Sequence, residues 1–290
     1  MIAALRPQLL FSFILLGVVA GAVWSCEGAE KGPPRAAPEG MVWIEGDDQQ
    51  AGFFMDATET TIADFAKFIT ATDYVTEAED FGWSGVFSKD SLTWLPVDSA
   101  TWLFPLGPAS RQSTGLAGSQ PATRELVPHS VGTSAPAATP VTQVSLRDVN
   151  AYLSWAGKQL PTEPEWTFAA AQSGTTTDFP WGEEMTPDGK YLGNWWQGPF
   201  PYEDNVLDDF PGVAPVKSFP PAANGLYDMS GNVWEWTATT DARTGQNIIK
   251  GGSFLCSTSY CTGFNLTQQQ LTPADSGLNH LGFRGIIRAK

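Results

Sequence analysis

Two cysteines near the C-terminal end of the chain are the strongest candidates for chemistry. Cys256 and Cys261 are five positions apart, in the segment Gly251-Gly252-Ser253-Phe254-Leu255-Cys256-Ser257-Thr258-Ser259-Tyr260-Cys261. This is not the two-residue spacing of a redox motif, and the sequence holds no second pair to complete a zinc site. Two interpretations of the pair are open. The cysteines form a small structural disulfide, which an oxidising compartment favours, or their thiolates bind a soft metal ion. Cu(I) is the natural candidate for that ion, and two thiolates leave room for a third.

A second group of residues carries oxygen atoms that can act as ligands of a hard cation. Asn194, Asp208, Asp228 and Glu235 lie in glycine-rich loop segments of the sequence. Side-chain oxygens and backbone carbonyls of such loops can together surround Ca²⁺. The alternative is that these residues are solvated, as most acidic residues in loops are.

Charge and histidine content exclude several other classes of function. The 290 residues include 31 Asp and Glu against 16 Lys and Arg, a net charge of −15, and the basic residues are scattered singly. This distribution argues against a nucleic-acid partner, which needs clustered positive charge. The two histidines, His129 and His280, are too few for zinc sites built on several imidazoles. A Ser-His-Asp triad stays formally possible, but no motif supports it.

The elements that must position these residues are short. The 29 Gly and 22 Pro predict many loops and turns, and 42% hydrophobic residues predict a folded core. Three helices are predicted to begin after Thr61, Ser145 and Thr162, each with an acidic residue three positions on. Residues 108–140 have loop composition, and the short aromatic segments from Phe179 onward predict short strands and ordered loops held by aromatic packing. We expect one domain over residues 40–290.

The N-terminus carries an export signal. An uncharged stretch runs from Pro7 to Ser25, so residues 1–25 are predicted to be a signal peptide. The residues around Cys26 resemble a bacterial lipoprotein cleavage site, which predicts lipidation of Cys26, a tether over 26–39 and a lipid-anchored protein of the bacterial cell envelope. Ordinary cleavage near Ala22 or Ser25 would instead leave a free secreted protein.

Six short motifs follow one another along the chain. They are Thr162-Glu163-Pro164-Glu165-Trp166, Phe179-Pro180-Trp181-Gly182, Asn194-Trp195-Trp196-Gln197-Gly198, Gly231-Asn232-Val233-Trp234-Glu235-Trp236, Lys250-Gly251-Gly252-Ser253 and Gly282-Phe283-Arg284. Thr58-Glu59-Thr60 and Tyr74-Val75-Thr76-Glu77-Ala78-Glu79 precede them. In type and order these motifs resemble those of one family, the formylglycine-generating enzymes or sulfatase-modifying factors. The resemblance implies an α+β fold of the C-type lectin-like kind, with little regular secondary structure and bound Ca²⁺.

The resemblance also implies two calcium sites. The first would take Asn194 and Asp208 through side chains, and Trp195 and Phe210 through backbone oxygens. The second would use Asp228, Glu235 and the backbone of Gly231 and Val233. The family usually has Asn in place of Asp228, but an Asp still offers oxygen donors.

For the cysteine pair, the resemblance implies an oxidase. In the active enzymes the matching cysteines bind Cu(I), the Cys of a sulfatase-type Cys-x-Pro-x-Arg peptide joins as third ligand, and O₂ oxidises that Cys to formylglycine. Ser253 and Trp234 match residues beside the oxygen pocket, although Trp234 could equally be a core residue. The expected cofactors are therefore Cu(I) and Ca²⁺, and the expected substrate is an unfolded sulfatase-type polypeptide bound by a monomer.

The segment after Cys261 differs from that of the active enzymes. They usually continue with aromatic and basic residues, whereas this chain has Thr262, Gly263, Phe264 and Asn265. A non-catalytic lectin-like envelope module that binds a protein or glycan is therefore the alternative function. A related non-haem iron oxidase of sulfur compounds is a third hypothesis, but those proteins carry a separate His-rich domain.

Overall fold

The structure, a computed structural model, describes residue 33 and residues 36–108, 137–172 and 177–289. The predicted signal peptide, Cys26 and His129 lie outside the described residues. The helices are α1 (Ile62–Thr72), α2 (Glu77–Phe81), α3 (Leu146–Trp155) and α4 (Glu163–Ala170). The strands are β1 (Met41–Ile44), β2 (Phe53–Asp56), β3 (Trp83–Ser88), β4 (Thr93–Asp98), β5 (Trp234–Thr240), β6 (Asn247–Lys250), β7 (Gln270–Thr272), β8 (Leu281–Gly282) and β9 (Ile286–Arg288).

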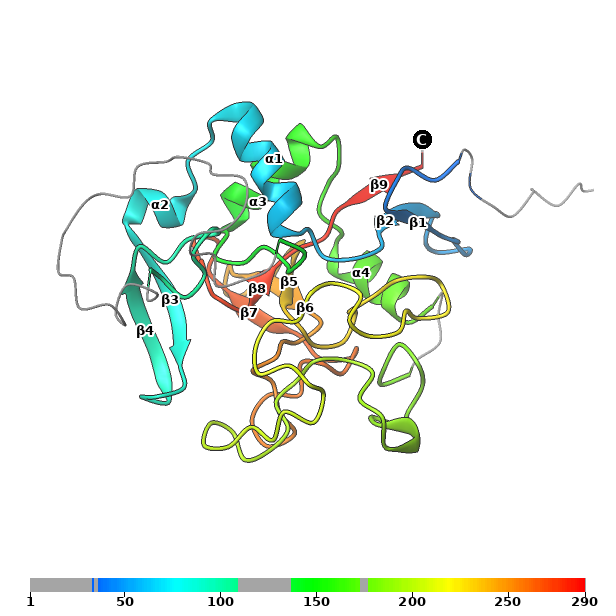
Figure 1. Ribbon diagram of the computed structural model, residues 1–290. Coiled ribbons are helices and arrows are strands. Elements are labelled where there is room, and N and C mark those ends of the chain that lie inside the picture. Colours follow the sequence, from blue (N-terminus) through cyan, green and yellow to red (C-terminus); the bar gives the residue numbers. More distant parts are fainter. Residues whose placement is uncertain (1–32, 34–35, 109–136, 173–176, 290) are drawn as a thin grey trace, which may run out of the picture. The chain divides into compact units, whose positions relative to one another are not determined.

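The described strands form three small sheets (Figure 1). One has the order β1-β2-β9, the hairpin β3-β4 forms the second, and the third has the order β7-β6-β5-β8. In the third sheet β5 pairs with β6 antiparallel and with β8 parallel. The parallel pair places Trp234, the first residue of β5, beside Leu281. Two segments that are distant in the sequence therefore meet at one end of this sheet.

The three predicted helices are present, and their caps explain where they begin. The side chain of Thr61 accepts a hydrogen bond from the backbone N–H of Asp64, which caps α1. Ser145 and Thr162 form complete capping boxes at α3 and α4, each satisfying two otherwise free donors. The short helix α2 and the hairpin β3-β4 were not predicted, although Thr76 forms a capping box of the same kind.

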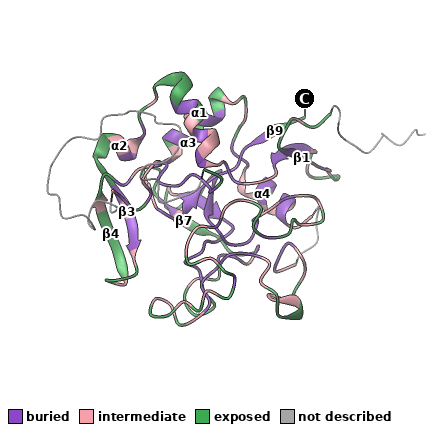
Figure 2. Ribbon diagram, in the orientation of Figure 1, coloured by how far each residue is buried: buried purple, intermediate pink, exposed green. Residues whose placement is uncertain are grey.

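The core lies between α1, α3 and the sheet that contains β5. Phe65 of α1 stacks on Tyr152 of α3 with ring centroids 5.6 Å apart. On the sheet side, the indole N–H of Trp236 donates to the backbone oxygen of Val144 at 3.1 Å. Figure 2 shows buried residues on the inner sides of α1 and α3 and an exposed β4. Aromatic burial of this kind is the main source of stability in a fold with short elements.

The described chain between α4 and β5 is loop without a strand, whereas the sequence predicts short strands as well as ordered loops from Phe179 onward. Its described part contains one short 3-10 helix, Pro187–Gly189, and is otherwise irregular. Aromatic contacts fix it to the rest of the domain, because Trp195 packs against Phe264, which follows β6, with ring centroids 5.3 Å apart. This loop carries Asn194, Asp208 and Asp228. Within the described part of the chain, no helix has the length and apolar character needed to cross a membrane.

Candidate functional site

The two cysteines form part of the wall of a cavity of about 620 Å³. Trp234, Ser253, Tyr260 and His280 line the same cavity. None of the described residues that line it is Asp, Glu, Lys or Arg. The cavity is therefore shaped by aromatic rings, hydroxyls and amides, although the chain as a whole is strongly acidic.

The loop that follows β6 places the cysteines in this wall. Gly252 has φ +74°, and a Cβ there would overlap the main chain of Phe264, so the tight turn requires glycine. The turn is held from both sides, since Gly231 N–H donates to Gly251 O at 2.7 Å and Phe254 N–H donates to Asn232 O at 2.9 Å. The backbone of the loop is thus fixed to the core on either side of Ser253.

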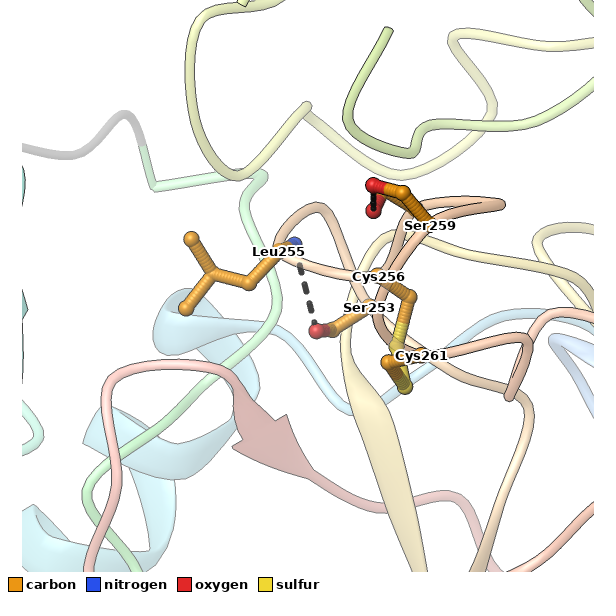
Figure 3. The surroundings of a disulfide bond; sticks show 6 residues. Ser253, Leu255, Cys256, Ser259 and Cys261 are labelled. Carbon is orange, nitrogen blue, oxygen red and sulfur yellow. Dashed lines mark hydrogen bonds between the residues drawn. A yellow bond between two sulfur atoms is a disulfide. The ribbon is translucent and has the colours of Figure 1, made fainter. Parts of the chain in front are cut away.

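Cys256 and Cys261 lie next to each other and are joined as a disulfide (Figure 3). Their Cα atoms are 4.6 Å apart, Cys256 is 2% exposed, and Cys261 is partly exposed. The hydroxyl of Ser253 lies nearby and accepts a hydrogen bond from the N–H of Leu255 at 3.3 Å. The spacing allowed either a disulfide or a pair of free thiolates, and the structure contains the disulfide. Reduction of the bond would leave two adjacent sulfur ligands, a donor set suited to a soft ion.

Trp234 is a buried residue that lines the same cavity as the two cysteines and is here called the floor of that cavity. It is 1% exposed, and its backbone N–H donates to the backbone oxygen of His280 at 2.8 Å. A Cβ on Gly263 would overlap the indole ring, so glycine is required where the chain after Cys261 crosses Trp234. Trp234 is therefore both a core residue and a lining residue of the cavity.

A row of aromatic rings forms the opposite wall, and sequence reasoning missed it. Phe200 stacks on Tyr260 with centroids 4.6 Å apart and on Phe87 with centroids 5.3 Å apart. Phe87 contacts Trp94, whose ring centroid lies 4.7 Å from that of His280. Only Tyr260 lies inside the cysteine segment. The other rings come from the unpredicted hairpin β3-β4 and from loops, so no local pattern could have marked them.

The residues predicted for the first calcium site do come together. Asn194 Oδ1 is buried, and in the described part of the chain it has no hydrogen-bond partner. Asp208 accepts from the N–H of Trp195 at 3.3 Å and from that of Phe210 at 3.0 Å, and burial raises the pKa of its carboxyl. The side-chain amide of Gln197 donates to both Trp195 O and Asp208 Oδ2. Several oxygen donors therefore converge here, which fits a hard cation.

The residues predicted for the second calcium site lie in a buried charge cluster. Arg284, with no exposed surface, donates to both carboxylate oxygens of Glu235 at 2.7–2.9 Å, and the indole N–H of Trp166 donates to the same carboxylate at 2.7 Å. Asp228 Oδ1 and Glu59 Oε2 are buried with no hydrogen-bond partner among the described residues. Burial raises the pKa of Asp228 to about 6 and that of Glu59 well above its usual value.

This cluster has more negative than positive charge. Three carboxylates, those of Glu59, Asp228 and Glu235, face the single guanidinium of Arg284. Buried charges without a partner are costly, so the two oxygens without partners fit a cation. Glu59 was not among the predicted ligands, although it lies in a quoted motif. The two predicted calcium sites are neighbours, because Asn232 N–H donates to Asn194 O at 2.8 Å and a Cβ on Gly231 would overlap the Asn194 main chain.

The described residues contain no group of three or more His, Cys, Asp or Glu side chains placed to hold a metal ion. The first calcium site would therefore need the Asn194 side chain and the backbone oxygens of Trp195 and Phe210 besides Asp208. The second would need the backbone of Gly231 and Val233 besides its carboxylates, as the resemblance implies. A metal ion at Cys256 and Cys261 would likewise need at least one ligand besides these two sulfur atoms.

Comparison with known proteins assigns the chain to a family. The model of the sulfatase-modifying factor enzyme 1-like domain matches residues 36–289. The formylglycine-generating enzyme of Mus musculus is 36% identical over 263 residues, which cover 80% of this chain and 65% of that protein. The formylglycine-generating enzyme of Thermomonospora curvata is 37% identical over 265 residues, 80% of each chain. The inactive C-alpha-formylglycine-generating enzyme 2 of Mus musculus is 37% identical, over 80% of this chain and 74% of that protein.

The fold is also found among solved structures. PvdO from Pseudomonas aeruginosa superimposes with a TM-score of 0.54 and 18% identity, over 86% of this chain and 92% of that one. Such a likeness shows the fold alone, a mixed α+β domain of the C-type lectin-like kind with little regular structure, as predicted. The family model and the relatives with 36–37% identity show that the chain belongs to the sulfatase-modifying factor family.

Proposed function

We propose that this protein oxidises a cysteine of a sulfatase-type polypeptide to formylglycine, with O₂ as oxidant and Cu(I) as cofactor. The observation that carries the proposal is the position of Cys256 and Cys261 in the wall of the 620 Å³ cavity, side by side. The names of the relatives that share 36–37% identity support the reaction. The substrate segment would be unfolded, so that its Cys can enter the cavity.

The chain's own residues would have distinct tasks. After reduction, the thiolates of Cys256 and Cys261 would hold Cu(I), and the substrate Cys would add a third sulfur. When bound, Cu(I) supplies a soft, redox-active centre for a thiol and O₂. The hydroxyl of Ser253, which already accepts from Leu255 N–H, would still have a hydrogen to donate to O₂ in the cavity. The buried indole of Trp234 would form part of the cavity wall beside the cysteines.

The overall reaction balances with an external reductant. The group –CH₂–SH and O₂, with two electrons and two protons, give –CHO, H₂S and H₂O. The substrate Cys supplies two of the four electrons that O₂ accepts, and a thiol reductant in the medium supplies the other two. That thiol would also open the disulfide between Cys256 and Cys261.

Two calcium ions are proposed as structural cofactors. The first would bind Asn194, Asp208 and the backbone oxygens of Trp195 and Phe210. The second would bind Asp228, Glu235 and the backbone of Gly231 and Val233, with Glu59 as a further oxygen donor. The buried oxygens without partners at Asn194, Asp228 and Glu59 support both assignments.

The place of action is proposed from the N-terminal sequence. Residues 1–25 would direct export, and lipid on Cys26 would anchor the domain through the tether 26–39 to a bacterial envelope membrane. A single acyl chain binds membranes only marginally, so stable attachment needs the several chains of lipoprotein processing. The substrate polypeptide would then have to meet the enzyme before it folds in the same compartment.

A non-catalytic binding module of the same fold is the competing function. Relatives named as inactive reach the same identity as those named as enzymes. The disulfide and the altered segment after Cys261 also fit a protein that no longer oxidises anything. Identity alone therefore does not separate the two functions, and the cysteines are the place to test them.

The experiment compares reduced protein, Cu(I)-loaded, with its Cys256→Ser and Cys261→Ser variants on a synthetic Cys-x-Pro-x-Arg peptide. Wild type should form the peptide aldehyde, detected as an oxime adduct, and both variants should lose Cu(I) binding and activity while keeping the melting temperature of the reduced wild type. Cys26→Ser is the matched control and should keep full activity. Equal product from wild type and both variants would exclude the cysteine pair as the centre of the reaction.

A further inference from the structure

His280 is a buried imidazole in the cavity wall that the reaction described above does not use. It lines the same cavity as Cys256, Cys261 and Ser253, and it is 7% exposed. Its Nδ1 atom is buried and has no hydrogen-bond partner within the described residues. A buried polar atom without a partner lowers stability, so such an atom needs a functional explanation.

The backbone holds His280 rigidly at this place. Its carbonyl oxygen accepts from Trp234 N–H at 2.8 Å, and the next residue, Leu281, begins β8 beside Trp234. On the preceding side, Asn279 Oδ1 accepts from Phe87 N–H at 3.2 Å. The imidazole lies against the ring of Trp94, with centroids 4.7 Å apart. The ring is thus fixed between the floor and the aromatic wall of the cavity.

The imidazole is neutral in this environment. Burial lowers the pKa of His280 to about 3, and no formally charged side chain appears among the described residues that line the cavity. A neutral imidazole can accept a hydrogen bond at one nitrogen and donate at the other. Nδ1 is closed off from the cavity, whereas Nε2 is not among the buried atoms and has no hydrogen-bond partner within the described residues, so a ligand that bonds Nε2 can determine which nitrogen carries the proton.

We propose that His280 is a substrate-positioning residue, whose imidazole hydrogen-bonds a main-chain amide of the polypeptide bound in the cavity. Main-chain amides are neutral, are present in every peptide, and have both a donor and an acceptor, so they match a neutral imidazole in an uncharged cavity. A carboxylate or ammonium group would have to give up its hydration here without a partner of opposite charge. His280 would therefore determine how deeply the peptide enters the cavity and in which direction it runs. Recognition of the peptide's side chains would depend on other contacts. This inference rests on the proposed function, because it concerns the same substrate.

The test measures peptide binding separately from turnover. The ligand is the Cys-x-Pro-x-Arg peptide with its Cys replaced by Ser, which cannot be oxidised, and the proteins are wild type, His280→Phe and His280→Asn. Phe keeps a planar ring against Trp94 but cannot form the hydrogen bond, and Asn restores a neutral donor and acceptor. We expect His280→Phe to weaken binding about tenfold, which corresponds to about 1.4 kcal/mol, and His280→Asn to recover most of it. On the oxidisable peptide, His280→Phe should raise KM more than it lowers kcat.

A second measurement identifies the partner atom. Replacing single amides of the peptide by esters removes one N–H donor at a time. One ester should weaken binding to wild type and have no effect on binding to His280→Phe, because both changes remove the same hydrogen bond. His280→Phe should also melt no lower than wild type, since it removes a buried polar atom without a partner.

The outcomes separate this inference from the proposed function. Equal peptide affinity in all three proteins, with oxidation intact, would overturn the role of His280 and leave the oxidase standing. Loss of affinity with a lowered melting temperature in both variants would make His280 a structural residue and also overturn the inference. If wild type binds and oxidises no peptide, the proposed function fails first, and the inference fails with it.

Discussion

Removal of Arg284 should cause the largest loss of stability of any single change at the buried charge cluster. The guanidinium has no exposed surface and donates to both oxygens of Glu235, to Tyr227 O at 2.9 Å and to Asp56 O at 3.2 Å. Arg284→Met keeps most of the side-chain volume but leaves Glu235 buried without its partner. Breaking one side of a buried ion pair costs about 3–5 kcal/mol. For a domain of this size each kcal/mol shifts the melting temperature by about 2–4 °C, so the expected decrease is roughly 6–20 °C.

The assay is thermal unfolding of the domain of residues 40–290, followed by circular dichroism, with Ca²⁺ and with a chelator. Ca²⁺ should offset part of the loss in Arg284→Met, because a cation bound at Asp228 and Glu235 would replace the missing positive charge. Arg243→Met is the matched control. Arg243 is an exposed arginine, 87% accessible, whose contact with Asp241 is 3.5 Å long, and its removal should leave the melting temperature unchanged. A decrease of less than about 2 °C in Arg284→Met, or equal decreases in both variants, would refute this reasoning.

Three further predictions concern calcium, acid stability and location. Asp208→Ala should lower the melting temperature and remove the part of its Ca²⁺ dependence that comes from the first site, since a ligand that binds only the folded state stabilises it by mass action. Identical melting of wild type with Ca²⁺ and with chelator would contradict the calcium proposal. Burial lowers the pKa of His280 from 6.5 to about 3, so the stability that the neutral imidazole contributes is present above pH 6.5 and is lost as the pH falls toward 3. Below pH 6.5 wild type should lose about 1.4 kcal/mol per pH unit relative to His280→Phe in urea unfolding, and parallel curves would show that the imidazole titrates normally. Full-length protein made in a bacterial host should sediment with membranes and Cys26→Ser should not; a mature N-terminus elsewhere, without lipid, would mean ordinary secretion.

The sequence predicted those parts of the fold that depend on local signals. Helix starts were predictable because the caps use residues three positions apart, as in Ser145 with Asp148 and Thr162 with Glu165. The hairpin β3-β4 was missed because β4 is almost wholly exposed and has no alternating apolar pattern. Its stability comes from contacts with distant segments, such as the hydrogen bond from Gly85 N–H to Gly277 O at 3.1 Å, which no local pattern encodes.

In the candidate site, too, only the features that depend on local signals could be predicted from the sequence. The cysteine pair was predictable because both members lie in one loop, and the residues proposed to bind calcium were named from motifs of the family. The pairing of Glu235 with Arg284 spans 49 positions, and the bond between Glu59 and Asn232 spans 173. The contact between Trp94 and His280 is equally non-local. Residues that meet only in the folded protein have no characteristic spacing in the sequence. The row of aromatic rings and the buried imidazole of His280 could therefore be found only from the structure.

The central claim is that the cysteine pair is the centre of an oxidase, and one measurement tests it most directly. The protein, reduced and loaded with one equivalent of Cu(I), is incubated in air with a thiol reductant and the Cys-x-Pro-x-Arg peptide, and the peptide is analysed by mass spectrometry over time. The account predicts many aldehyde products for each protein molecule, with none from Cys256→Ser or Cys261→Ser. A peptide that stays unmodified, with a protein that binds no Cu(I) after its disulfide is reduced, would contradict the account and favour the non-catalytic binding module.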